Sequence, residues 1–232
     1  MKIINILITI FIAIILEIGT NSCSKNNDNN VPTNKIEQVI PAELLTQIKE
    51  YMPINEGTTP PNISGCYLMS PTILVYSTLK EDNKDIDDKN EWCDMYYKFT
   101  APNSNNTIGY ESKEYNDGVI RSSSYSTEFN IMGYGNSFTT YMVINSNELD
   151  GITAKKATII SGTKTSEGIE NMTVAFIMLD KNDPEENLVP INTIRIFTDK
   201  DGLSINTTFP PQSKTVKKQS TNKRRFRTLS IR

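Results

Sequence analysis

The chain has 232 residues, with 24 basic and 27 acidic side chains and no histidine. The lack of histidine excludes nucleophilic sites of the Ser-His-Asp and Cys-His types, and zinc sites that use imidazole. Eight basic and no acidic residues lie in 214–232, which leaves 24 − 8 = 16 basic against 27 acidic residues elsewhere. An acidic body argues against a nucleic-acid-binding domain, which carries its basic side chains on the fold itself.

Residues 1–22 are typical of a signal peptide. Lys2 is followed by 14 largely apolar residues, from Ile3 to Leu16. A transmembrane helix needs about 20 such residues, whereas this shorter run suits the apolar region of a signal peptide. An uncleaved N-terminal membrane anchor is the alternative.

Cys23 follows this segment in the sequence GTNSC. This stretch resembles the lipobox of bacterial lipoproteins, in which a diacylglyceryl group is attached to the cysteine. The resemblance implies a lipid-anchored protein at the outer membrane, on its periplasmic face or at the cell surface. Residues 23–38 are polar and rich in asparagine, so we expect a disordered tether. A signal peptide cleaved nearby, with Cys23 incidental, remains the alternative.

Residues 39–210 are long enough for one domain with its own core. A short helix is predicted over residues 41–52, because Pro41 suits a first helical turn and Pro53 stops the helix. We expect this helix to act as a lid or plug packed on the domain. Its apolar face consists of Leu44, Leu45, Ile48, Tyr51 and Met52.

From Gly65 onward the pattern indicates β-strands. Apolar and polar residues alternate in residues 92–99 and 125–131, whereas residues 172–179 carry apolar side chains on both faces, as in a central, well-covered strand. Cys93, Met95, Tyr97 and Phe99 share one predicted face, and so do Tyr125, Thr127, Phe129 and Ile131. We predict strands near 65–76, 92–99, 107–114, 119–134, 138–145, 155–164, 171–180, 192–198 and 203–209.

Three Asp-Gly pairs separate these strands, at Asp117, Asp150 and Asp201. Asp-Gly suits the positive φ angles of tight hairpin turns. No helical pattern lies between the strands to connect parallel neighbours. The sequence therefore predicts a mainly β fold, an antiparallel meander of about eight or nine strands that closes into a barrel. A β-sandwich is the alternative.

Two stretches resemble a known family. Gly65-Cys66-Tyr67 opens the first strand, and residues 159–181 form a glycine-punctuated hairpin that leads into an apolar strand. They are similar to Gram-negative surface lipoproteins with a lipocalin-like barrel, over about residues 53–210. The resemblance implies a barrel that holds a small apolar ligand, and it assigns no binding residue.

The two remaining cysteines are predicted to be unpaired. If strands 65–76 and 92–99 form a hairpin, Cys66 and Cys93 lie about nine residues apart along the sheet. At roughly 3.3 Å per residue, this distance is far beyond the reach of a disulfide.

Two acidic stretches could hold calcium but have simpler interpretations. The residues from Asp199 to Gly202 (DKDG) start like an EF-hand loop, yet the glycine comes at position four instead of six, so we predict a hairpin turn. The segment from Lys80 to Glu91 holds six carboxylates interleaved with three lysines, and we interpret it as a solvated surface loop.

We therefore predict a non-enzymatic, lipid-anchored envelope protein that binds a small apolar or amphiphilic ligand, without metal or cofactor and without a nucleic-acid partner. A structural, adhesive or glycan-binding module is the alternative, and a carboxylate-dependent hydrolase is a minor one. The basic residues 211–232 are predicted to be a disordered tail, with contact to anionic lipid as the alternative. Aromatic residues that could stack on sugars, but that we expect in the core, are Trp92, Tyr96, Tyr97, Tyr110, Tyr115, Tyr125, Tyr134 and Tyr141.

Overall fold

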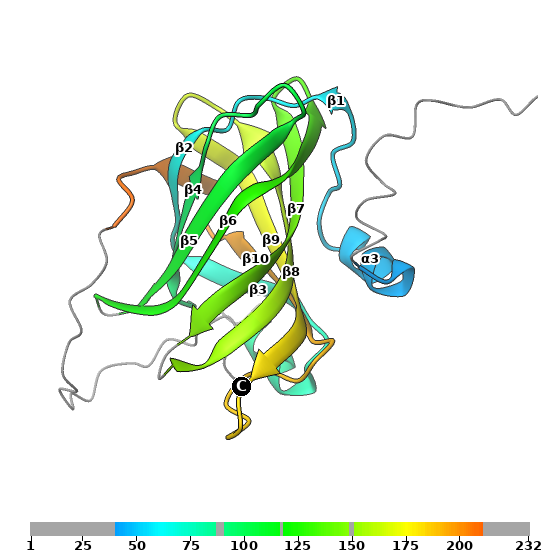
Figure 1. Ribbon diagram of the computed structural model, residues 1–232, viewed down its shortest axis with the longest axis vertical. Helices are drawn as coiled ribbons and strands as arrows, with labels where there is room; N and C mark the ends of the chain where they lie inside the picture. Colours follow the sequence, from blue (N-terminus) through cyan, green and yellow to red (C-terminus); the bar gives the residue numbers. More distant parts are fainter. Residues whose placement is uncertain (1–39, 87–90, 117, 149–150, 211–232) are drawn as a thin grey trace, which may run out of the picture. The chain divides into compact units, whose positions relative to one another are not determined.

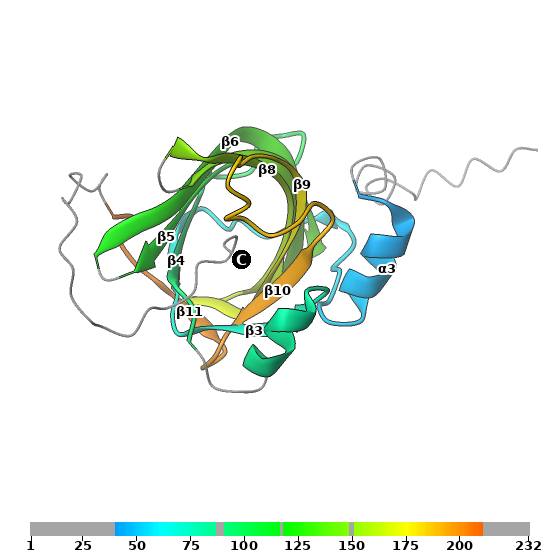
Figure 2. The ribbon, with the colours of Figure 1, turned by 90° about the horizontal axis from the view of Figure 1, so that it is seen from below.

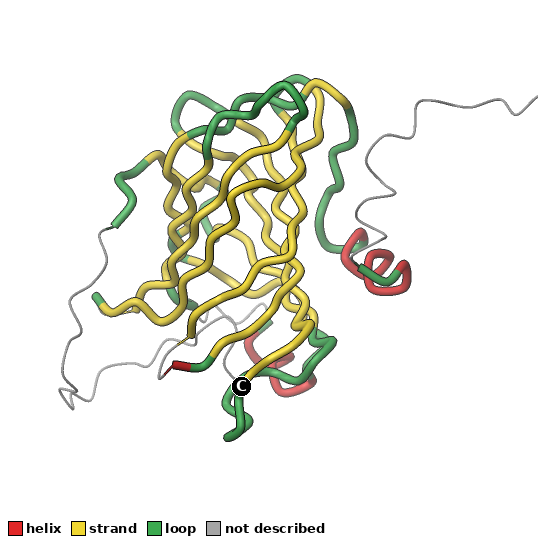
Figure 3. Tube along the Cα trace, in the orientation of Figure 1, coloured by secondary structure: helices red, strands yellow, loops and turns green. Residues whose placement is uncertain are grey.

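The computed structural model describes residues 40–86, 91–116, 118–148 and 151–210. The predicted signal peptide, Cys23, the tether and the basic tail lie outside these residues. Strands make up most of the described part (Figure 3). The elements are α3 (Ala42–Lys49), β1 (Thr58–Thr59), β2 (Gly65–Met69), β3 (Thr72–Ser77), the 3-10 helix η1 (Lys80–Asp85), β4 (Asp94–Phe99), β5 (Thr107–Asn116), β6 (Val119–Tyr134), β7 (Ser137–Glu148), β8 (Thr153–Lys164), β9 (Gly168–Asn182), β10 (Ile194–Asp199) and β11 (Leu203–Asn206).

The sheet closes into a ring of eight strands (Figures 1 and 2). From β4 to β9, each strand pairs in antiparallel fashion with the next strand of the chain. The ring closes because β11 pairs with β9 on one side and with β2 on the other, while β2 also pairs with β4. The predicted antiparallel meander that closes on itself is thus confirmed, as one continuous sheet and not two stacked sheets.

The first and last strands of the ring are each interrupted. β2 and β3 follow one line, broken at Ser70 and Pro71, and β3 pairs with β10 from Thr72↔Asp199 to Ser77↔Arg195. β10 and β11 both run antiparallel to β9, so they point in the same direction. The prediction of a hairpin at Asp201 is therefore wrong. Gly202 does take a positive φ of 82°, but the chain resumes its course along β9 after this turn.

The helix α3 covers the outer face of the sheet. Leu45 and Ile48 are buried on it, and they belong to an apolar cluster with outward-facing residues of β6 to β10. The apolar run of β9 is explained by this cover: Met172, Val174 and Phe176 face the interior of the ring, while Ala175 and Ile177 meet the helix cluster. The helix therefore lies against the outside of the ring and does not plug it.

The strand alternation predicted for β4 is confirmed, because Cys93, Met95, Tyr97 and Phe99 are all buried. The face predicted for Tyr125 is wrong, since its side chain is 68 % exposed. The pairing of β6 with β7 shifts register between Tyr125 and Asn130. An irregularity of this kind moves the following residues to the other face, so Phe129 and Ile131 point inward.

Cys66 and Cys93 form no disulfide with each other, as predicted. The register that supported the prediction was wrong, because Cys66 lies opposite Lys98 and thus only 98 − 93 = 5 residues from Cys93 along β4. The segment after β3 folds into η1 and does not form a tight hairpin, which shifts the pairing of β4. Among the described residues, no helix is long and apolar enough to cross a membrane.

Candidate binding site at the polar end of the ring

The interior of the ring has two chemically different ends. We call the end with the β6–β7 and β8–β9 turns the apolar end. Aromatic side chains fill it: the ring of Tyr110 lies 5.9 Å from that of Phe99 and 5.8 Å from that of Phe129, while Tyr67 lies 6.0 Å from Phe99. The Tyr67 hydroxyl donates a hydrogen bond to the carbonyl of Ile63 at 2.9 Å. The Gly-x-Tyr motif thus places a tyrosine at the closed, filled end of the ring.

The opposite end, where β5 meets β6 and β7 meets β8, is lined with small polar side chains. The register places Ser112 opposite Ser124, and Ser124 opposite Ser146. In the next row, Ser122 lies between Glu114 and Glu148. Ser112 and Glu114 pair with Tyr97 and Met95, whose side chains belong to the interior core. We call this end the polar end, and its polar wall consists of Ser112, Glu114, Ser122, Ser124, Ser146 and Glu148.

The polar wall differs from the apolar end in the size of its side chains. The interior of an eight-stranded ring is just wide enough to be filled by side chains or to hold one small ligand. Aromatic side chains fill the interior of the ring at the apolar end, whereas serine side chains are too short to reach the middle of the ring. All six residues of the polar wall are nevertheless buried, with 1–8 % of their surface exposed.

An ion pair joins this wall to the next strand. Lys156 of β8 lies with its Nζ 2.6 Å from Oε1 of Glu148, and the two side chains are only 6 % and 1 % exposed. Ser146 Oγ donates a second hydrogen bond to the same oxygen at 2.6 Å. A buried carboxylate needs such partners, because taking a charge out of water costs several kcal/mol.

A second buried ion pair lies on β10, two strands along the sheet from β8. Arg195 of β10 donates two hydrogen bonds to Asp82 of η1, at 2.7 and 2.9 Å, and both side chains are 1 % exposed. Ser77 donates to the same carboxylate at 2.6 Å, and the guanidinium lies 5.1 Å from the centre of the Trp92 ring. The prediction of a solvated loop is therefore wrong for Asp82, which fastens η1 to the sheet. No group of three or more metal-binding side chains is present in the described part of the chain.

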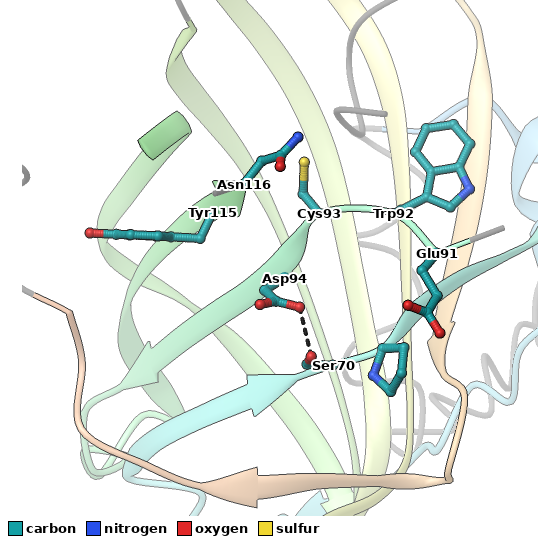
Figure 4. A pocket seen from close by; sticks show the side chains of 8 residues that line it. Ser70, Glu91, Trp92, Cys93, Asp94, Tyr115 and Asn116 are labelled. Carbon is teal, nitrogen blue, oxygen red and sulfur yellow. Dashed lines mark hydrogen bonds between the residues drawn. The ribbon is translucent and has the colours of Figure 1, made fainter. Parts of the chain in front are cut away.

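A small pocket opens at the rim of the polar end (Figure 4). It has a volume of about 200 Å³, and Ser70, Glu91, Asp94 and Asn116 are among the residues that line it. Ser70 Oγ donates a hydrogen bond to Asp94 Oδ1 at 2.6 Å. Figure 4 shows this bond, with the ring of Trp92 pointing away from it. The pocket is smaller than the ~300 Å³ of an ordinary ligand site, so by itself it suits only a small polar group.

A third carboxylate lies where the ring closes. Asp199 is buried, and its Oδ2 accepts hydrogen bonds from Ser204 Oγ at 2.9 Å and from the backbone N–H of Ser70 at 3.3 Å. The buried Oδ1 has no hydrogen-bond partner among the described residues. Burial raises the pKa of Asp199 to about 6, and the carboxyl of Asp201 adds to the rise, while the hydrogen bonds from Ser204 and Ser70 oppose it.

The aromatic residues considered as sugar-stacking candidates separate into two groups. Trp92, Tyr97, Tyr110 and Tyr141 are buried, as expected for core residues, whereas Tyr125 and Tyr134 are 68 % and 77 % exposed, and Tyr96 and Tyr115 are half-buried. The sequence did not reveal the polar wall or the ion pairs Lys156–Glu148 and Arg195–Asp82. The serine-rich start of β6, with Ser122, Ser124 and Ser126 at alternate positions, was a visible signal, because residues at alternate positions of a strand share one face.

Comparisons with known proteins found no match to this chain. No protein-family model matches the chain. No curated protein and no solved structure matches it either.

Proposed function

We propose that this chain is a lipid-anchored, non-enzymatic protein of the cell envelope that binds a small amphiphilic ligand at the polar end of the ring. The observation that carries the proposal is the buried polar wall, which faces the interior of a ring of the size that holds one small ligand. The lipid anchor at Cys23 and the location at the outer membrane rest on the sequence. The absence of histidine supports a role other than catalysis by a histidine-dependent nucleophile.

An amphiphilic ligand fits this interior better than a purely apolar one. Buried hydroxyls and carboxylates cost free energy unless they form hydrogen bonds, and an alkyl chain offers none. The apolar side chains next to the polar wall, including Met95, Ile144 and Met178, would accept the apolar part of the ligand. The hydroxyls of Ser122 and Ser124 would bind its polar group.

Native mass spectrometry of the mature protein from its own host tests this proposal. We expect an additional mass that is lost on denaturation. Ser124→Phe fills the polar end and should abolish the additional mass, whereas Ser123→Phe adds the same group to the outer face of β6 and should leave it unchanged. A bare wild-type mass at good signal would refute ligand binding. Equal loss in both variants would show that the ligand does not lie at the polar wall.

A second candidate, a glycan-binding surface, is favoured by the exposed tyrosine on β6. Tyr125 lies opposite Glu111 on the outer face, with 68 % of its surface exposed. An exposed aromatic ring beside a carboxylate can stack on a sugar and accept hydrogen bonds from its hydroxyls. A glycan array tests this candidate: binding that is lost in Tyr125→Ala but kept in Ser124→Phe would favour it over the interior site.

A further inference from the structure

The polar wall carries one carboxylate on each side of a serine. Ser122 of β6 lies opposite Glu114 of β5 in one direction and opposite Glu148 of β7 in the other. Residues directly opposite each other in antiparallel strands have Cβ atoms roughly 5 Å apart. A ligand group that reaches the hydroxyl of Ser122 therefore lies close to both carboxylates.

Two hydroxyls of the wall are available to such a group. Ser122 and Ser124 are only 2 % and 6 % exposed, and both face the interior of the ring. Among the described residues, neither hydroxyl has a hydrogen-bond partner. A buried hydroxyl costs free energy unless it forms a hydrogen bond. These two side chains thus mark the place where the polar group of a ligand binds.

The charges of the polar wall do not balance. Glu148 is paired with Lys156, whose Nζ lies 2.6 Å from Oε1 of the carboxylate. With Glu114, the wall and its ion pair hold one lysine and two glutamates, a balance of 1 − 2 = −1. The buried guanidinium of Arg195 does not change this balance, because it is matched by the carboxylate of Asp82.

The negative charge of Glu114 acts on the interior of the ring. Tyr110 belongs to the interior core, and burial is the main cause of its raised pKa. The carboxylate of Glu114 adds to the rise in this pKa, while the hydrogen bond with Ser112 opposes it. Charges interact more strongly in a protein interior than in water. An anionic group at the wall would therefore be repelled, whereas a cationic group would be attracted.

We propose that the ligand is an amphiphile with an ammonium group, which lies between Glu114 and Glu148. Its N–H groups donate hydrogen bonds to the hydroxyls of Ser122 and Ser124, since an ammonium has only donors and a hydroxyl oxygen accepts. The same charges disfavour fatty acids and other anionic amphiphiles. This inference rests on the proposed function, because it names the class of ligand that the same site takes.

Three probes with the same alkyl chain and different charge test the inference: decylamine, decanol and decanoate. At pH 7 the amine is positively charged and the acid is negatively charged. Their affinities for the mature protein are measured by calorimetric titration. An acidic protein also attracts cations to its surface, so binding at the site is the part that Ser124→Phe abolishes. We expect decylamine to bind the site roughly tenfold or more tightly than decanol, and decanoate to bind more weakly than decanol.

A pair of matched variants locates the charge. Glu114→Gln removes one carboxylate from the wall, and Glu170→Gln removes the same group from an exposed position on β9. Glu114→Gln should lower the affinity for decylamine roughly tenfold and leave that for decanol nearly unchanged. Glu170→Gln should leave both affinities unchanged. Decanol binding also reports whether Glu114→Gln is folded, and if it is not, the ranking of the probes on the wild type still tests the inference.

Two outcomes would overturn the ammonium assignment. One is decanoate that binds the wild type as tightly as decylamine, and the other is an equal loss of decylamine affinity in Glu114→Gln and Glu170→Gln. In both cases the proposed function stands if decanol binds and Ser124→Phe abolishes its binding. If none of the three probes binds the wild type, the result contradicts the proposed function together with this inference.

Discussion

Replacement of Lys156 by methionine tests whether the polar end of the ring is dry. The side chains of Lys156 and Glu148 are 6 % and 1 % exposed, so the substitution leaves a carboxylate in the interior without the cation that lies 2.6 Å from it. Methionine keeps most of the apolar length of lysine, including its approach to the ring of Phe176, which Lys156 Nζ reaches at 5.6 Å. The lost charge is therefore the main change.

The magnitude follows from the burial. Removal of one partner of a buried ion pair costs about 3–5 kcal/mol, whereas an exposed pair contributes about 0–1 kcal/mol. Equilibrium unfolding in urea at pH 7 measures the difference. With a slope of about 2 kcal/mol per molar urea, the unfolding midpoint of Lys156→Met should fall by roughly 2 M.

Two further variants make the experiment decisive. Lys155→Met changes the neighbouring residue, which is exposed on the outer face. This variant should change the free energy of unfolding by less than about 0.5 kcal/mol. The double variant Lys156→Met with Glu148→Leu removes both charges and should recover most of the stability. A cost below about 1 kcal/mol for Lys156→Met alone would refute the reasoning, because it would show that water reaches the pair.

Three other predictions concern the seam, the apolar end and the thiols. The raised pKa of Asp199, about 6, means that the folded state binds the proton more tightly than the unfolded state. The contribution of this proton to stability is fully present below about pH 4 and is lost as the pH rises through about 6, so Asp199→Asn should reduce the fall in unfolding free energy over this range. Urea unfolding between pH 4 and 8 measures this, and the same pH dependence of the unfolding free energy in both proteins would contradict it. Tyr67→Phe removes the hydrogen bond to Ile63 and should cost about 1–3 kcal/mol of unfolding free energy, since it leaves a buried carbonyl without that donor; an unchanged midpoint would argue against this bond. In the native protein a maleimide should label half-buried Cys66 faster than buried Cys93, which should react only on unfolding; equal native rates would be inconsistent with the burial of Cys93.

The local pattern of the sequence determined the elements of this fold. The strand predicted over residues 119–134 coincides with β6, and the helix predicted over 41–52 contains α3. These predictions succeed because alternation of apolar side chains and the proline stops act over a few neighbouring residues. The meander followed as well, since strands joined by short turns pair with their neighbours.

Long-range pairing was decided only by the tertiary structure. Asp201 and Gly202 form a turn in either arrangement, and only the pairing of β10 and β11 with β9 shows that the strand continues past it. The outward position of Tyr125 depends on a register shift against β7, which the sequence of β6 alone does not contain.

The candidate site was also decided only by the tertiary structure. Asp82 and Arg195 are 113 residues apart in the chain, and each alone looks like an ordinary surface charge. Ser112, Ser124 and Ser146 belong to three different strands, and they form one wall only because these strands align in register. The sequence alone gives the chemical type of each residue. The distances between the side chains of the site depend on how the ring closes, so only the tertiary structure shows them.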